Sequence, residues 1–247
     1  MSSTVATNTS RFAADLRDST SPSRKLRDKL FLTGLWVATL IGVLTLFFLV
    51  LSTLLKGYTR LNLSLITNFP SPFPEDAGIQ AAIFGSIWVV VTSGVVSLFI
   101  ALGSAIYLEE FASQSSRFNR LISINIQTLA GVPSIVFGIL GLAFVARGWL
   151  GWGFTVGTAS AVLTMMVLPV MIVSAREALK AVPSSLREGS YALGATKWQA
   201  ISKQVLPAAI PGIATGSILG VSRALGESAP LILLGALAYV SSNPSGL

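Results

Sequence analysis

The chain has no Cys and no His among its 247 residues, and only 11% of them are charged. Without Cys it has no disulfides, thiolate metal sites or Cys nucleophiles, and without His it has no imidazole base or imidazole metal ligand. Soluble domains carry roughly a quarter charged residues. A hydrophobic content of 52% therefore excludes a typical water-soluble enzyme. We expect no catalytic residue, no metal site and no cofactor in this chain.

The charge that is present is mostly basic, with 17 Lys and Arg against 10 Asp and Glu, a net charge of +7. These charges occur in short blocks that are separated by long apolar runs. This pattern is typical of a membrane protein and not of a nucleic-acid-binding protein. We therefore expect a lipid bilayer, and no nucleic acid, among the partners.

Five apolar stretches are long enough to cross a bilayer, because a helical span needs roughly 20 apolar residues. Among these only the fifth stretch carries charges in its middle, Arg223 and Glu227. The predicted fold class is an all-α membrane protein, a polytopic helical bundle over residues 30–247. Its spans are expected at about 30–55, 79–108, 121–146, 157–175 and 211–235, with a cytoplasmic loop at 176–210.

The N-terminal residues 1–29 are rich in Ser and Thr and end in a basic block, which predicts a disordered, basic cytoplasmic tail. With the N-terminus in the cytoplasm, most Lys and Arg lie on the cytoplasmic side and only Lys56, Arg60 and Arg147 lie outside. The exterior segment 56–78 is a Pro-rich loop, too small to capture a solute. The sequence thus predicts a multi-pass protein that needs a separate solute-binding partner.

The loop at 176–210 is polar, yet it carries signals of two short helices. Pro183 suits the first helical position, residues 184–193 follow, and Gly194 stands where a left-handed residue ends a helix. Thr196, with a Gln three residues later, matches a capping box that opens a second helix.

In that second helix, Trp198, Ile201 and Val205 recur on one face, and Pro207 is expected to end it. Two interpretations fit this pair of helices. It could lie on the lipid surface as an interfacial amphipathic element. Alternatively, it could dock a soluble partner in the cytoplasm.

The spacing within this loop resembles the EAA loop, the coupling-helix signature of membrane subunits of bacterial ABC importers. Glu188 is followed six positions later by Gly194 and then twelve later by Leu206 and Pro207. Gly189 and the Ser after it stand where the signature has two alanines. The resemblance implies an ATPase-coupling role for Glu188, Gly189, Ala192, Gly194, Ala195, Thr196, Trp198, Leu206 and Pro207.

Four further stretches resemble the permease subunits of the phosphate-specific ABC importer, which have a type I ABC importer transmembrane fold. The Ala-Pro-Leu at 229–231 is more similar to the A-type than to the C-type subunit. That family normally has six spans, so the resemblance implies that the last is missing here. The stretches are GVPSIVFG at 131–138, REGSYALGATKWQ at 187–199, VLPAAIPGI at 205–213 and RALGESAPL at 223–231.

The resemblance also implies partners and a location. The partners are a second permease subunit in a heterodimer, a cytoplasmic ATPase dimer and an extracytoplasmic phosphate-binding protein, in the bacterial inner membrane. The chain contains no G-x-x-x-x-G-K-S/T phosphate loop. ATP is therefore expected to be bound and hydrolysed by the partner and not by this chain.

The fifth span carries its charges at a cost of about 3 kcal/mol for an ionised side chain at the bilayer centre. Arg223 and Glu227 are four residues apart, so they share a helix face and can pair. One interpretation is a purely structural ion pair. The other, implied by the resemblance, is that both line the translocation path.

On that second interpretation the guanidinium of Arg223 binds a tetrahedral oxyanion and Glu227 orients it. Glu227 would also favour phosphate over sulfate, because phosphate near neutral pH carries a proton that it can donate to a carboxylate. Pro133 and Pro230 are expected to bend their spans, which fits either an alternating-access path or ordinary kinked packing. Residues 212, 216, 220 and 224 are small and predict close helix packing.

Other functions remain open at this point. An importer for sulfate or molybdate would share the loop but need not share Arg223 and Glu227. A channel would have no use for a coupling loop, and a membrane-embedded enzyme would need a second acidic group or a nucleophile beside Glu227.

Overall fold

The computed structural model describes residues 22–73, 75–113 and 115–235, and in these ranges the chain is helical with no strand. It divides into two compact units, residues 1–62 and 63–247, which are described separately. In the described ranges, four helices are long and apolar enough to cross a membrane, or five if one sharply bent pair counts as a span. The all-α, polytopic architecture expected from the sequence is confirmed.

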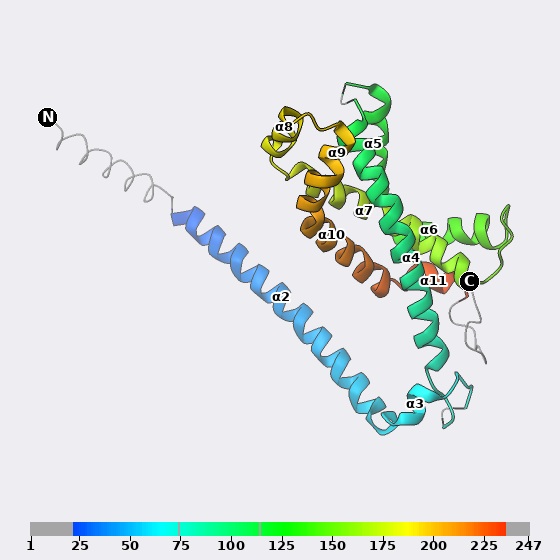
Figure 1. Cartoon of the computed structure of the whole chain (residues 1–247). Helices are drawn as coiled ribbons and strands as arrows, with labels where there is room; N and C mark the ends of the chain where they lie inside the picture. The colour runs from blue at the N-terminus through cyan, green and yellow to red at the C-terminus, as the bar shows by residue number, and fades with distance from the viewer. Residues whose placement is uncertain (1–21, 74, 114, 236–247) are drawn as a thin grey trace. The chain divides into compact units, whose positions relative to one another are not determined.

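The first unit consists of α2 (Pro22–Gly57) and the short 3-10 helix η1 (Tyr58–Arg60) (Figure 1). The helix begins eight residues before the predicted span, so the expectation of a disordered tail is wrong for residues 22–29. Pro at a first helical position and the Arg, Lys and Leu that follow all favour a helix. The rest of the predicted tail, residues 1–21, lies outside the described residues.

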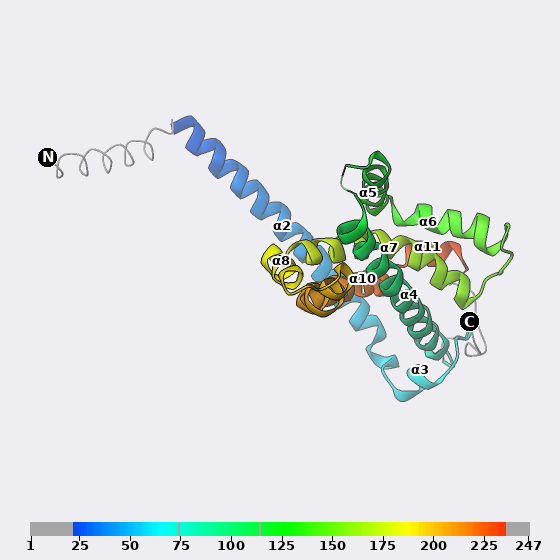
Figure 2. The same cartoon turned by 45° about the horizontal axis from the view of Figure 1, so that its top comes forward.

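The second unit is built on three helices that lie side by side, α4 (Gln80–Ile106), α7 (Val156–Lys180) and α10 (Leu206–Gly226) (Figures 1 and 2). The helix α7 packs against both α4 and α10, and its side chains fill the centre of the core. The largest fully buried residues of α7 are Leu163, Leu179, Val162 and Val167. The short α3 (Leu63–Thr67) precedes α4 in the predicted exterior loop.

Small residues let α10 approach α7 closely, as the sequence predicts. A Cβ added at Gly216 would lie 2.5 Å from the Cβ of Ser174, and one added at Gly212 would lie 2.8 Å from the Cβ of Ala178. Gly220 faces Met171 in the same way, at 2.8 Å from its Cγ. Such contacts replace the hydrophobic driving force that is absent between helices in lipid.

The predicted span at 121–146 is not one straight helix. It forms α5 (Arg117–Ala130), α6 (Ser134–Leu140) and the π-helix η3 (Gly141–Ala146), with a bend of 103° between α5 and α6. Pro133 lies at the bend, where it has no N–H to donate and disfavours a helical conformation in the residue before it. Pro133 therefore produces a sharp turn and not a slight kink.

The predicted fifth span is also interrupted. The helix α10 ends at Gly226, the backbone of Glu227 is extended, with φ −86° and ψ 117°, and α11 (Ala229–Leu233) follows. Pro230 stands in the first turn of α11 and explains why the helix cannot continue. Residues 236–247 lie outside the described residues.

The helix that contains α10 begins earlier in the sequence than the predicted span, at Lys197 and not at about residue 211. The helix α9 (Lys197–Ala200), the π-helix η4 (Ile201–Val205) and α10 follow one another without a break. The prediction that Pro207 ends the second loop helix is therefore wrong. Pro207 lies two residues after the end of the π turn. The wider turn accommodates a residue that cannot donate the i→i−4 backbone hydrogen bond.

Replacing Gly216 by Ala is expected to destabilise the α7–α10 contact by about 1–3 kcal/mol, because the new Cβ overlaps Ser174. Gly103→Ala is the matched control, since a Cβ there meets nothing within 4 Å. We expect the control to be neutral or slightly stabilising, because Ala favours a helix. The free energy of unfolding in detergent measures both, and equal effects would contradict the close packing.

Candidate functional site

The loop between α7 and α10 has the two-helix structure that the sequence predicts. The helix α8 (Ser184–Ala192) follows Pro183, which is the N-cap and not the first helical residue as expected. Gly194 has φ +80°, the left-handed conformation that L side chains rarely adopt. Thr196 and Gln199 form the capping box, with the Thr196 Oγ1 accepting from Gln199 N at 3.3 Å and the Gln199 Oε1 accepting from Thr196 N at 2.8 Å.

Most of the predicted coupling residues lie on the surface of this loop. Ala195 and Leu206 are half-buried. Leu193, which sequence reasoning did not single out, is 90% exposed between the two helices. The exposed coupling residues are Glu188, Gly189, Ala192, Gly194, Thr196, Trp198 and Pro207.

The three apolar residues of the second loop helix do not share one environment. Ile201 and Val205 are fully buried, whereas Trp198 is 59% exposed. The predicted apolar face is therefore buried only at Ile201 and Val205. Trp198 lies in α9, before the π turn η4, and its side chain belongs to the exposed surface.

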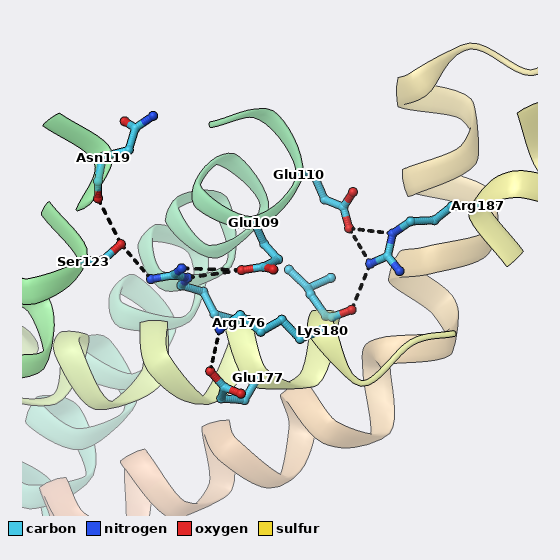
Figure 3. A network of polar contacts seen from close by, with 9 residues as sticks. Glu109, Glu110, Asn119, Ser123, Arg176, Glu177, Lys180 and Arg187 are labelled. Carbon is cyan, nitrogen blue, oxygen red and sulfur yellow. Dashed lines mark hydrogen bonds and ion pairs between the residues drawn. The ribbon is translucent and has the colours of Figure 1, made fainter. Parts of the chain in front are cut away.

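The helix α8 is fastened to the bundle by Arg187 (Figure 3). Its guanidinium donates to the Glu110 Oε1 from Nη2 at 2.7 Å and from Nε at 3.2 Å. It also donates to the backbone carbonyls of Val182 and Leu179, at 2.9 and 3.0 Å, just after and near the end of α7. One side chain thus satisfies carbonyls at the end of α7 and joins α8 to the end of α4.

A second ion pair lies beside the first (Figure 3). The Arg176 guanidinium of α7 lies 3.5 Å from the Glu109 Oε2, and its Nη1 donates to the Ser123 Oγ of α5 at 3.0 Å. Arg176 and Glu109 are 12% and 14% exposed, so both are largely screened from water. This pair connects α7 to the end of α4 and to α5.

Glu109 and Glu110 belong to η2 (Tyr107–Phe111), the π-helix that continues α4. The next residue of η2, Phe111, contacts the Lys197 ammonium of α9, which lies 5.0 Å from the ring centre. Three consecutive residues of η2 therefore contact α7, α8 and α9 in turn. Sequence reasoning missed this group of contacts. The only sequence signal for it was the pair of adjacent carboxylates, Glu109 and Glu110, at the end of a predicted span in a chain that has more basic than acidic residues.

The second group of predicted site residues lies at the break between α10 and α11. The Arg223 Nε and the Glu227 Oε1 are 3.6 Å apart, which confirms that the two side chains pair. The expectation that both stand on one continuous helix is wrong, because α10 ends before Glu227. The Arg223 side chain is 41% exposed and that of Glu227 is 19% exposed, so Arg223 keeps donors that do not face Glu227.

The two interrupted spans meet at this place. The helix α11 packs against α6, and a Cβ added at Gly138 would lie 2.7 Å from the Cα of Pro230 (Figures 1 and 2). Gly138 therefore permits backbone contact between the segment after the Pro133 bend and the segment after Glu227. In membrane proteins, interrupted helices of this kind are found where backbone lies within protein or lines a cavity.

Residues 97–245 match the family described as binding-protein-dependent transport system inner membrane component. The chain belongs to this family. It is a permease subunit of an ABC transporter and a multi-pass inner-membrane protein. The matched region begins within α4 and includes both the α8–α9 loop and the Arg223–Glu227 pair.

Relatives among curated proteins agree with this assignment. The chain is 31% identical over 217 residues to a probable ABC transporter permease protein, YqgI of Bacillus subtilis, covering 87% of this chain and 72% of the relative. It is 30% identical over 218 residues to the phosphate transport system permease protein PstA 1 of Mycobacterium tuberculosis strain CDC 1551, covering 85% and 70%.

A solved structure shows the same fold. An inward-facing form of the MetNI methionine ABC transporter superposes with a TM-score of 0.56 over 64% of this chain and 73% of that chain, at 23% identity. The fold is therefore that of the type I ABC importer permeases.

A double-mutant cycle tests the Arg187–Glu110 contact. We expect Arg187→Gln and Glu110→Gln each to lower the free energy of unfolding, with a coupling of about 1–3 kcal/mol between them, because each leaves a largely buried charge without its partner. The control cycle uses Lys180 and Glu177, an ion pair that is 43% and 63% exposed, and should show no measurable coupling. Equal coupling in both cycles would contradict the anchoring role of Arg187.

Gly194→Pro tests the turn between α8 and α9. Pro fixes φ near −65°, which the turn at φ +80° cannot accept, so we expect ATP hydrolysis to be uncoupled from transport. Gly189→Ala is the control, since a Cβ there meets nothing within 4 Å and it restores an alanine of the EAA signature. ATPase activity and uptake are measured together in proteoliposomes. Normal coupling in Gly194→Pro would show that this turn is dispensable.

Proposed function

We propose that this chain is the A-type permease subunit of an ABC importer that moves inorganic phosphate into the cytoplasm. The observation that carries the proposal is the Arg223–Glu227 pair, which lies at the helix break where the candidate membrane span Lys197–Gly226 ends. The similarity to the phosphate transport system permease protein PstA 1 of Mycobacterium tuberculosis supports the choice of substrate.

The chemistry of the pair suits a tetrahedral oxyanion. A guanidinium presents a planar fork of N–H donors that matches two oxygens of phosphate, and it stays charged at every physiological pH. Because Glu227 lies 3.6 Å from Nε, it orients the guanidinium while other donors remain open. A protonated phosphate oxygen can donate to a carboxylate in this position, whereas sulfate has no such proton. This difference gives a physical basis for selectivity.

The α8–α9 loop is the element that would receive motion from a cytoplasmic ATPase dimer. Its outward surface carries Leu193 and Trp198, and its inner side is held by Arg187 and Lys197. Both inner contacts end on η2, which continues directly into α4. Movement of the loop is therefore passed to a long membrane-spanning helix without a flexible joint. This rigid connection favours a docking element over a peptide lying loosely on lipid.

The complete transporter on this proposal also contains a second permease subunit, in a heterodimer, and an extracytoplasmic phosphate-binding protein. ATP is bound and hydrolysed by the ATPase subunits. The excess of Lys and Arg in residues 11–29 and 176–207 favours a cytoplasmic N-terminus and a cytoplasmic α8–α9 loop. The Arg223–Glu227 pair then belongs to the path between the two sides.

Radiolabelled phosphate uptake in cells that lack their own permease subunit tests the substrate. We expect wild-type uptake to resist excess sulfate or molybdate and to fall at least about tenfold in Arg223→Ala, because a charge-assisted contact is lost. Arg223→Lys keeps the charge without the fork and should transport more weakly than wild type. Full uptake by Arg223→Ala would return the pair to a structural role.

Glu227→Gln tests selectivity separately. The amide keeps the shape of the side chain but has no negative charge and gains an N–H donor that can bind sulfate, so sulfate should compete more strongly for uptake than it does with the wild type. The measurement is the sulfate concentration that halves phosphate uptake. If neither uptake nor sulfate rejection changes, Glu227 does not discriminate between the two anions. Competition by molybdate alone would instead indicate another oxyanion as substrate.

A further inference from the structure

A cavity of about 360 Å³ lies beside η2, between the first turns of α5 and the helix α7. A water molecule occupies roughly 30 Å³ in the liquid, so this volume has room for a phosphate group and several waters. Among the described residues, no Asp or Glu lines the cavity. Its polar lining consists of Ser113, Asn119, Arg120, Ser123 and Arg176.

Arg176 retains hydrogen-bonding capacity toward an anion. Its Nη2 donates to the Glu109 Oε2 at 3.5 Å and its Nε lies 3.5 Å from the same oxygen, and both distances exceed the 2.7–2.9 Å of a strong charge-assisted bond. Its Nε is buried and has no hydrogen-bond partner among the described residues. A buried guanidinium with an unsatisfied donor is costly, which indicates room for a further acceptor.

Arg120 adds a second positive charge, and in the described part of the chain it has no ion-pair partner. It stands in the first turns of α5, a helix of 14 residues whose N-cap, Ser116, makes no side-chain capping bond. The first backbone N–H groups of an uncapped helix and the positive end of its dipole both favour an anion. Positive charge and the polarity of α5 therefore both favour an anion at this cavity.

We propose that this cavity is a second anion site, which binds a phosphate group between Arg120 and Arg176. The group has two possible sources, free inorganic phosphate or the headgroup of an anionic phospholipid. The free-phosphate source rests on the proposed function, whereas the lipid source does not. An anion bound here competes with Glu109 for Arg176 and so acts on the contact between α7 and η2.

The first arm of the test measures binding of radiolabelled inorganic phosphate to the transporter, purified with its co-expressed partner subunits in nanodiscs of neutral phosphatidylcholine. All samples carry Arg223→Ala, which removes the proposed translocation site. We expect Arg120→Gln to weaken binding about tenfold or more. Arg117→Gln is the matched control, because Arg117 is exposed on the same helix, loses the same charge and does not line the cavity.

The second arm uses nanodiscs that contain phosphatidylglycerol and counts the anionic lipids that stay bound to the complex by mass spectrometry. Retention that falls in Arg120→Gln but not in Arg117→Gln identifies a lipid headgroup as the source. Phosphate binding in neutral nanodiscs that responds in the same way identifies free phosphate. If Arg120→Gln and Arg117→Gln behave alike for both probes, the site does not exist. Phosphate uptake by the wild type is a separate experiment. If the wild type does not transport phosphate, the proposed function fails, but the two binding measurements can still be interpreted.

Discussion

The contact between Arg187 and Glu110 is the interaction on which the arrangement of this permease depends. Glu110 is 7% exposed, and a carboxylate so far from water requires a charged partner. Arg187 supplies that partner and at the same time satisfies two carbonyls at the end of α7. Without it, α8 would keep its packing against η4 and α9 but would lose its ionic contact with η2. With it, the surface loop is tied both to η2, which continues α4, and to the end of α7.

A second constraint is set by proline inside apolar segments. Pro133 and Pro230 each interrupt a helix, and the segments that follow them, α6 and α11, pack against each other through Gly138. Because of this second interruption, Glu227 has extended backbone and still pairs with Arg223. The close α7–α10 contact made by Gly212, Gly216 and Gly220 holds the other end of the same segment. The charged pair thus lies where two interrupted helices meet, an arrangement in which polar groups can face protein and not lipid.

Local sequence signals predicted local structure well. Apolar runs gave the helices, Gly194 gave the left-handed turn and the Thr196 motif gave the capping box, because each depends on neighbouring residues only. The bend of 103° was underestimated, because hydropathy does not change where a chain turns inside a membrane. The exposure of Trp198 is set by tertiary packing around α9, which the local residue pattern does not predict. The Arg187–Glu110 contact joins residues 77 apart in sequence, and only the packing of α4 against α7 brings them together.

The central claim is that the α8–α9 loop drives the membrane helices through Glu110 of η2. The most direct measurement is the number of phosphate ions moved per ATP hydrolysed, in proteoliposomes that contain the complete transporter with Glu110→Gln in this chain. Glu177→Gln, in the exposed pair with Lys180, is the control. We predict that ATP hydrolysis continues in Glu110→Gln while phosphate moved per ATP falls well below the control. An unchanged ratio would contradict the claim.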